Sequence, residues 1–166
     1  GIGTGMACYA DGHYLTNPDK MARKEAQQVL IDFLEAAHIL GDTVVLFGLM
    51  KGPLPDPRER EKYKDILFES LQPVIEAAEK FGNDLTIEAI NRFQAAYLWS
   101  ADETLEFVER FDSKRATIHL DTFHINIEDK DMERAIRICK DRLGYFHVSD
   151  SDRAIRDMDI LILKNV

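Results

Sequence analysis

Short apolar runs alternate with longer segments of helical periodicity along this chain, and this alternation constrains the fold more than any other feature. The helical segments carry one apolar stripe each, and they cover residues 16–41, 56–82, 100–111 and 131–144. The strand-like runs lie between and around them, at residues 2–9, 43–49, 85–90, 116–121 and 145–150. Because parallel strands need a crossover between them, this repeat predicts an α/β fold with a parallel sheet.

The two longest predicted helices have recognisable ends. The first begins at Asn17–Pro18 and ends at Gly41. The second begins at Asp56–Pro57, where the aspartate can cap the helix, and it ends at Gly82. Pro73 lies inside the second helix, and since proline removes one backbone donor, we expect it to kink or split that helix.

Three successive strands have one entirely apolar face and one mixed face. Since side chains alternate along a strand, Glu88, Asp121 and His147 all fall on the mixed faces, towards the carboxyl ends of their strands. An open sheet covered by helices on both sides would be apolar on both faces, whereas a barrel turns its mixed faces inward. We therefore expect a (β/α) barrel of TIM type, whose functional sites lie at the carboxyl ends of the strands.

These three side chains have the chemistry of a divalent-metal site. Two carboxylates and one imidazole suit Mn²⁺, Mg²⁺, Co²⁺ or Fe²⁺, and Zn²⁺ is a further candidate. A single strand-terminal carboxylate is more often a helix or loop cap, and a single inward histidine is more often a hydrogen-bonded core residue. His119, one layer below Asp121, is interpreted as such a core histidine. Three residues in register on neighbouring strands favour the metal site.

Charge and cysteine content narrow the expected partners and compartment. The formal charge of −9 and the pI of about 5.0 argue against a nucleic-acid or anionic-membrane partner. No apolar run approaches the roughly 18–20 residues that a membrane span requires. Cys8 and Cys139 are too few for a disulfide framework or a cysteine zinc site, so we expect a reduced, cytoplasmic setting.

Several motifs resemble one known superfamily. The stretches "IEAINRF", "LDTFHINIED" and "YFHVSDSDR" are similar to the xylose-isomerase-like barrels, in the branch of sugar (or sugar phosphate) isomerases and epimerases. Within that branch they resemble D-tagatose/D-psicose 3-epimerases. Upstream, "GIGTGMACYADGHYLTNPD" and "FGLMKG" resemble the loops after the third and fourth strands. The resemblance covers nearly the whole of residues 1–153.

The resemblance implies a ligand set and a mechanism. The metal ligands of the family fall on Glu88, Asp121 and His147, with Mn²⁺ as the favoured ion and Glu88 also as a catalytic proton acceptor. The implied reaction is proton transfer next to the carbonyl of an open-chain sugar, through an enediolate.

The resemblance also implies substrate-binding residues. His124 and Arg153 match positions that hold sugar hydroxyls, and Gln94 stands where many relatives have a glutamate. Lys51 in "GLMKG" allows two interpretations, a ligand for a substrate phosphate or hydroxyl, or a solvated loop lysine, and the second is favoured.

By this resemblance the chain holds strands three to seven of an eight-stranded barrel, which needs about 250 residues. Residues 1–153 form the barrel segment, and the tail at 154–166 ends in an apolar run compatible with one more strand. The second catalytic glutamate of the family lies on the eighth strand, so we expect the 166 residues alone to be inactive. Two alternatives remain open: a metal-dependent hydrolase of the apurinic-site endonuclease type, and a non-catalytic half-barrel that self-associates as a homo-oligomer.

Overall fold

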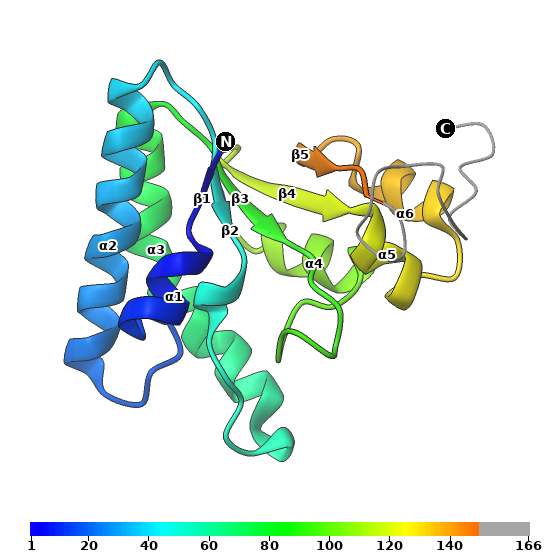
Figure 1. Ribbon diagram of the computed structural model, residues 1–166, viewed down its shortest axis with the longest axis horizontal. Helices are drawn as coiled ribbons and strands as arrows, with labels where there is room; N and C mark the ends of the chain where they lie inside the picture. Colours follow the sequence, from blue (N-terminus) through cyan, green and yellow to red (C-terminus); the bar gives the residue numbers. More distant parts are fainter. Residues whose placement is uncertain (150–166) are drawn as a thin grey trace.

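A computed structural model describes residues 1–149 and contains one parallel sheet (Figure 1). The strand order is β1-β2-β3-β4-β5, and every pair is parallel. The strands are β1 (Ile2–Gly3), β2 (Val45–Phe47), β3 (Leu85–Glu88), β4 (Ala116–Asp121) and β5 (Leu143–His147). Sequential order without reversal is the arrangement of barrel strands, so the predicted partial TIM barrel is confirmed as a five-stranded parallel half-barrel.

The helices lie mostly on the outer side of this sheet. They are α1 (Gly5–Asp11), α2 (Lys20–Ile39), α3 (Arg60–Phe81), α4 (Ala101–Val108), α5 (Thr122–Glu128) and α6 (Met132–Cys139), with short 3₁₀ turns at Leu49–Lys51 and Pro57–Glu59. In Figure 1, α2 and α3 run side by side along one flank of the sheet, and α5 and α6 lie near β5. We call α2 and α3 together the helix layer.

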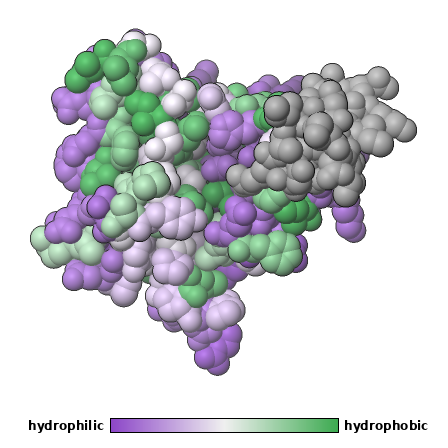
Figure 2. Space-filling view, viewed as in Figure 1, coloured by the Kyte–Doolittle hydropathy of each residue, from purple (hydrophilic) through white to green (hydrophobic). Residues whose placement is uncertain are grey.

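The core lies between the helix layer and the outward face of the strands. Buried apolar residues of the layer repeat at helical spacing, and they are Ala26, Leu30, Leu34 and Ala37 of α2 and Tyr63, Leu67, Leu71, Val74, Ile75 and Ala78 of α3. The outer side of α2 is largely hydrophilic in Figure 2, where a hydrophobic patch marks its upper end. Ile39 and Leu40 are exposed at that end.

The helix ends follow from their capping residues. Asp19 caps α2 by accepting a hydrogen bond from the Met21 amide at 2.7 Å. Gly82 ends α3 in the left-handed conformation, with φ of 83°. The expected split at Pro73 does not occur, because α3 continues as one helix from Arg60 to Phe81 and keeps its buried stripe on both sides of the proline.

Two predictions about local structure are wrong. Residues 2–9 were expected to be one strand, but only Ile2–Gly3 pair with β2, and α1 follows. The ladder ends at Thr4, whose hydroxyl donates to the Leu46 carbonyl at 2.8 Å. The helix α5 was not expected, because its seven residues are too few to show a helical period.

The last strand approaches β4 very closely. A Cβ at Gly144 would lie 2.2 Å from Thr117 Oγ1 and 2.8 Å from Thr86 Cγ2. Only glycine permits this approach, which brings β5 against the threonine side chains on the inner face of the sheet. His147 ends the same strand three residues later.

Candidate metal and sugar site

The carboxyl ends of β3, β4 and β5 place five polar side chains in one group. Glu88, Asp121 and His147 are the last residues of these strands. His119 lies on β4 and His124 on α5. We call these five residues the strand-end cluster.

Strand register determines which members of the cluster are level with one another. Glu88 pairs with His119 across β3 and β4, and Asp121 pairs with His147 across β4 and β5. A bulge between Ile118 and His119 shifts the register of β4 against β5. The cluster therefore spans two layers, and His119 stands at the level of Glu88.

Distances within the cluster are short enough for a shared cation. Glu88 Oε1 lies 3.8 Å from His119 Nδ1 and 3.6 Å from His124 Nε2. Asp121 Oδ2 lies 3.8 Å from His147 Nδ1. Two groups have ligand atoms that all lie within 4.8 Å of one another: Glu88, His119 and His147, and Glu88, Asp121 and His124. Glu88 belongs to both groups.

Glu88 is held from two sides by neighbouring loops. A Cβ at Gly48 would lie 2.5 Å from Glu88 Oε2, so the absence of a side chain after β2 leaves room for the carboxylate. The Lys51 ammonium donates to the Glu88 carbonyl oxygen at 2.6 Å. The Glu88 side chain remains 16% exposed, which leaves the carboxylate accessible.

Lys51 is buried, and the interpretation as a solvated loop lysine is wrong. Only 1% of it is exposed, and burial lowers the pKa of its ammonium to about 8, against the opposing effect of Glu88 and Glu103. The sequence gives no sign of this, because the residue lies between two glycines in a proline-rich loop.

Asp121 has a structural role as well as a place in the cluster. Its Oδ1 accepts a hydrogen bond from the Phe123 amide at 2.9 Å, which caps α5, and another from Ser149 Oγ at 3.0 Å. The Ser149 backbone is fixed in turn, since its amide donates to Thr122 Oγ1 at 2.8 Å and its carbonyl accepts from that hydroxyl at 2.6 Å.

His119 was interpreted as a hydrogen-bonded core histidine, and the structure corrects this. The residue is buried, but neither ring nitrogen has a hydrogen-bond partner among the described residues. Its ring packs edge to face on Tyr145 and His147, with centroids 5.4 and 4.3 Å away. Burial, followed by the nearby His147, lowers the pKa of His119 to about 3, so its imidazole is neutral at physiological pH.

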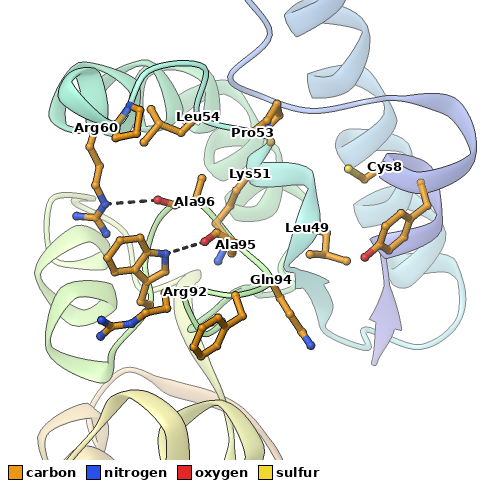
Figure 3. A pocket seen from close by; sticks show the side chains of 15 residues that line it. Cys8, Leu49, Lys51, Pro53, Leu54, Arg60, Arg92, Gln94, Ala95 and Ala96 are labelled. Carbon is orange, nitrogen blue, oxygen red and sulfur yellow. Dashed lines mark hydrogen bonds between the residues drawn. The ribbon is translucent and has the colours of Figure 1, made fainter.

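The residues expected to bind substrate are spread over the site. His124 is buried, and its Nδ1 lies 2.8 Å from Asn91 Nδ2, so its Nε2 faces Glu88. Gln94 lines a neighbouring pocket (Figure 3). Arg153 and the tail at 154–166 lie outside the described residues.

This pocket has a volume of about 670 Å³ (Figure 3), and it adjoins the strand-end cluster through Lys51. Lys51 links the two, since its side chain lines the pocket and its ammonium binds the Glu88 carbonyl. Also in the pocket lining, Trp99 Nε1 donates to the Ala95 carbonyl at 2.7 Å, and the Arg60 guanidinium lies 4.0 Å from the Trp99 ring. Apolar and amide groups beside a carboxylate–imidazole cluster form a concave surface suited to a small polar ligand.

The donor chemistry of the cluster fits a divalent ion. Carboxylate oxygens and neutral imidazoles are ligands for such ions, and the nitrogens of buried His119 have no hydrogen-bond partner within residues 1–149. Fold and site together define a (β/α) barrel with a carboxylate–imidazole cluster at the carboxyl ends of its strands. The chain belongs to the xylose isomerase-like TIM barrel family, whose model matches residues 2–159.

Its relatives within that family are sugar epimerases, which confirms the resemblance seen in the motifs. A D-psicose 3-epimerase of Ruminiclostridium cellulolyticum is 30% identical over 148 residues, 85% of this chain and 49% of that protein. An L-ribulose 3-epimerase of Mesorhizobium japonicum is 40% identical over 84 residues, 51% of this chain and 28% of that protein.

A solved structure agrees with this assignment. The structure of D-psicose 3-epimerase with D-tagatose from Clostridium cellulolyticum H10 superposes with a TM-score of 0.79 at 28% identity, over 87% of this chain and 51% of that one. The chain therefore spans about half the length, or less, of the relatives it matches. Within residues 1–149, no helix has the length and apolar character needed to cross a bilayer.

Proposed function

We propose that this chain carries the metal- and sugar-binding part of a divalent-metal-dependent sugar or sugar phosphate epimerase. The observation that supports this most strongly is the convergence of Glu88, Asp121 and His147 at the ends of three adjacent parallel strands. In a (β/α) barrel this end carries the catalytic groups. The relatives named D-psicose and L-ribulose 3-epimerase support a ketose as substrate.

Glu88, Asp121 and His147 would hold the ion, with Mn²⁺ as the favoured metal. The chemistry that such an ion supplies when bound is polarisation of adjacent sugar oxygens, which acidifies the carbon between them. Glu88 would accept the proton from that carbon, since its carboxylate is partly exposed at the mouth of the cluster. The sugar would pass through an enediolate and regain a proton on the opposite face.

His124, Gln94 and Arg153 would orient the sugar. The Asn91 amide lies 2.8 Å from His124 Nδ1, which fixes the ring and directs Nε2 towards the site. Gln94 lines the pocket beside the cluster, where its amide can both donate to and accept from a hydroxyl. A neutral amide supplies no charge for an ion pair, so this position favours an uncharged part of the sugar.

The proposal is tested on metal binding by the 166-residue chain. Electron paramagnetic resonance should show tight Mn²⁺ binding, and D-fructose or D-tagatose should then lower the water-proton relaxation that bound Mn²⁺ causes. Glu88→Gln should lose most Mn²⁺ affinity, whereas Glu25→Gln, an exposed glutamate of α2, should bind like the wild type. Equal binding by all three proteins, or bound Mn²⁺ that ignores both sugars, would contradict the proposal.

Turnover gives a second test. Epimerisation needs a proton acceptor and a proton donor on opposite faces of the carbon, and the resemblance assigns the second carboxylate to a strand after β5. We therefore expect the 166 residues with Mn²⁺ and D-fructose to form no 3-epimer by chromatography. Measurable product would show that Glu88 and its neighbours are sufficient.

A further inference from the structure

The pocket beside the strand-end cluster has cationic side chains in its lining and, among the described residues, no carboxylate. Its charged lining residues are Lys51, Arg60 and Arg92 (Figure 3), and the other side chains of the lining are neutral. The chain as a whole carries 30 acidic residues against 21 basic ones. The positive character of this pocket is therefore a local arrangement and does not follow from the composition.

Two of the three cations are held around Trp99 by carboxylates that lie outside the lining. The guanidinium carbons of Arg60 and Arg92 lie 4.0 and 5.5 Å from the centroid of the Trp99 ring. Arg60 forms an ion pair with Glu103 at 2.6 Å, and Arg92 forms one with Glu128 at 2.6 Å. These ion pairs fix the two guanidinium groups in the pocket wall and offset part of their charge.

The charge of Lys51 is compensated much less. The residue is 1% exposed, and its ammonium donates to the Glu88 carbonyl, which is a neutral acceptor. Within residues 1–149 it forms no ion pair, although the more distant carboxylates of Glu88 and Glu103 act on it. Burying a charge without a close counterion is costly, and an apolar side chain of the same length would avoid the cost. The position therefore has a reason to hold a cation beyond the packing of its loop.

We propose that this pocket binds the anionic end of the substrate, and that the substrate is a ketose phosphate whose phosphate group lies between Lys51 and the arginines at Trp99. The inference rests on the proposed function for the sugar at Glu88, and it adds the class of that sugar. Lysine binds phosphate as a point charge, and a buried charge attracts an anion strongly because little water screens it. Gln94 in the same lining is then available to a hydroxyl of the sugar. A free ketose would still bind, but more weakly.

The test uses Trp99, the only tryptophan of the chain, whose fluorescence therefore reports on this pocket. The 166-residue chain is titrated in the presence of a chelator with D-fructose 6-phosphate, D-fructose and inorganic phosphate. D-fructose 6-phosphate should bind at least about 10-fold more tightly than either of the others, because a hydrogen bond to a charged group contributes more than a neutral one. This preference should shrink in high salt.

Three variants assign the preference to the cations of the pocket. Lys51→Met should lower the affinity for D-fructose 6-phosphate to that for D-fructose. The Arg92 side chain is 56% exposed, so Arg92→Gln is a second variant that should fold, and it should weaken binding of the phosphate ester about 2- to 5-fold. Lys80→Met removes an exposed lysine at the far end of α3 and should match the wild type. Far-UV circular dichroism checks folding.

Equal affinities for D-fructose and D-fructose 6-phosphate overturn the inference, as does a preference that both Lys51→Met and Arg92→Gln retain. D-fructose 6-phosphate that binds no more tightly than inorganic phosphate would indicate a general anion site and would also overturn the assignment of the substrate. These titrations contain no free metal ion, so their failure leaves the proposed function to be decided by Mn²⁺ binding at Glu88. Conversely, a chain that binds no Mn²⁺ contradicts the proposed function, while the fluorescence titrations still decide whether the pocket selects a phosphate.

Discussion

The helix layer and the strand-end cluster bury their side chains in opposite ways. Between α2 and α3 the buried residues are mainly apolar, and a polar contact such as Gln27 to the Ser70 carbonyl is satisfied at 2.9 Å. At the ends of β3–β5 the buried residues include a lysine, an aspartate and two histidines, and one histidine has no hydrogen-bond partner among the described residues. The layer is arranged for stability, whereas the cluster retains a buried polar group whose burial costs stability.

The largest effect on stability is expected in the helix layer. Leu71 of α3 is fully buried, so Leu71→Ala should remove its packing and leave a cavity, at a cost of about 2–5 kcal/mol in unfolding free energy. Urea denaturation measures this cost. The Zn²⁺ affinity of the folded fraction should stay unchanged. A large loss of affinity would show that packing in the helix layer also determines metal binding at the strand-end cluster.

In the strand-end cluster, a substitution is expected to raise the unfolding free energy rather than lower it. His119→Leu replaces an unsatisfied imidazole with an apolar side chain of similar size, so the metal-free chain should gain about 1–3 kcal/mol in unfolding free energy. Thermal melts of the metal-free proteins measure this effect, and a destabilised variant would contradict the comparison.

Removing the polar contact inside the helix layer is expected to cause a smaller loss of unfolding free energy. Gln27→Met keeps the length of the side chain but removes the hydrogen bond to Ser70, which should cost about 0.5–1.5 kcal/mol. Gln28→Met on the next, exposed position is the matched control, since its partner Asp32 lies on the surface of the same helix. Equal effects of the two variants would show that burial of the contact is unimportant.

The smallest effect on stability is expected from removing a surface ion pair between α4 and α6. Arg134 donates to Asp102 from both terminal guanidinium nitrogens, at 2.6 and 2.8 Å, but both side chains are 55% exposed. Arg134→Met should therefore cost only about 0.2–1 kcal/mol, and the loss should shrink in high salt. Chemical denaturation at two salt concentrations checks this.

Local patterns in the sequence were enough to predict the elements of the helix layer. The apolar stripes of α2 and α3 and the end of α3 at Gly82 were confirmed within a few residues. The strands β3 and β4 were likewise visible as apolar alternation that ends in an acid. These features depend on neighbours a few residues apart, which a single sequence displays.

The details of the cluster depend on contacts between distant segments, and these were not predictable. The bulge at Ile118/His119 and the pairing of His119 with Glu88 are set by how β3, β4 and β5 align. The burial of Lys51 depends on the loops that cover it. The sequence therefore predicted which residue types meet at the strand ends, but not that His119 stands level with Glu88.

Gly48 shows that the site can exclude a side chain at a position whose backbone conformation would accept one. Its φ of −116° is not in the left-handed region, so its backbone conformation does not explain the glycine. The restriction comes from Glu88 Oε2, which occupies the place of a side chain. A saturation mutagenesis screen should accordingly find position 48 intolerant when scored by metal uptake and much more permissive when scored by protein abundance.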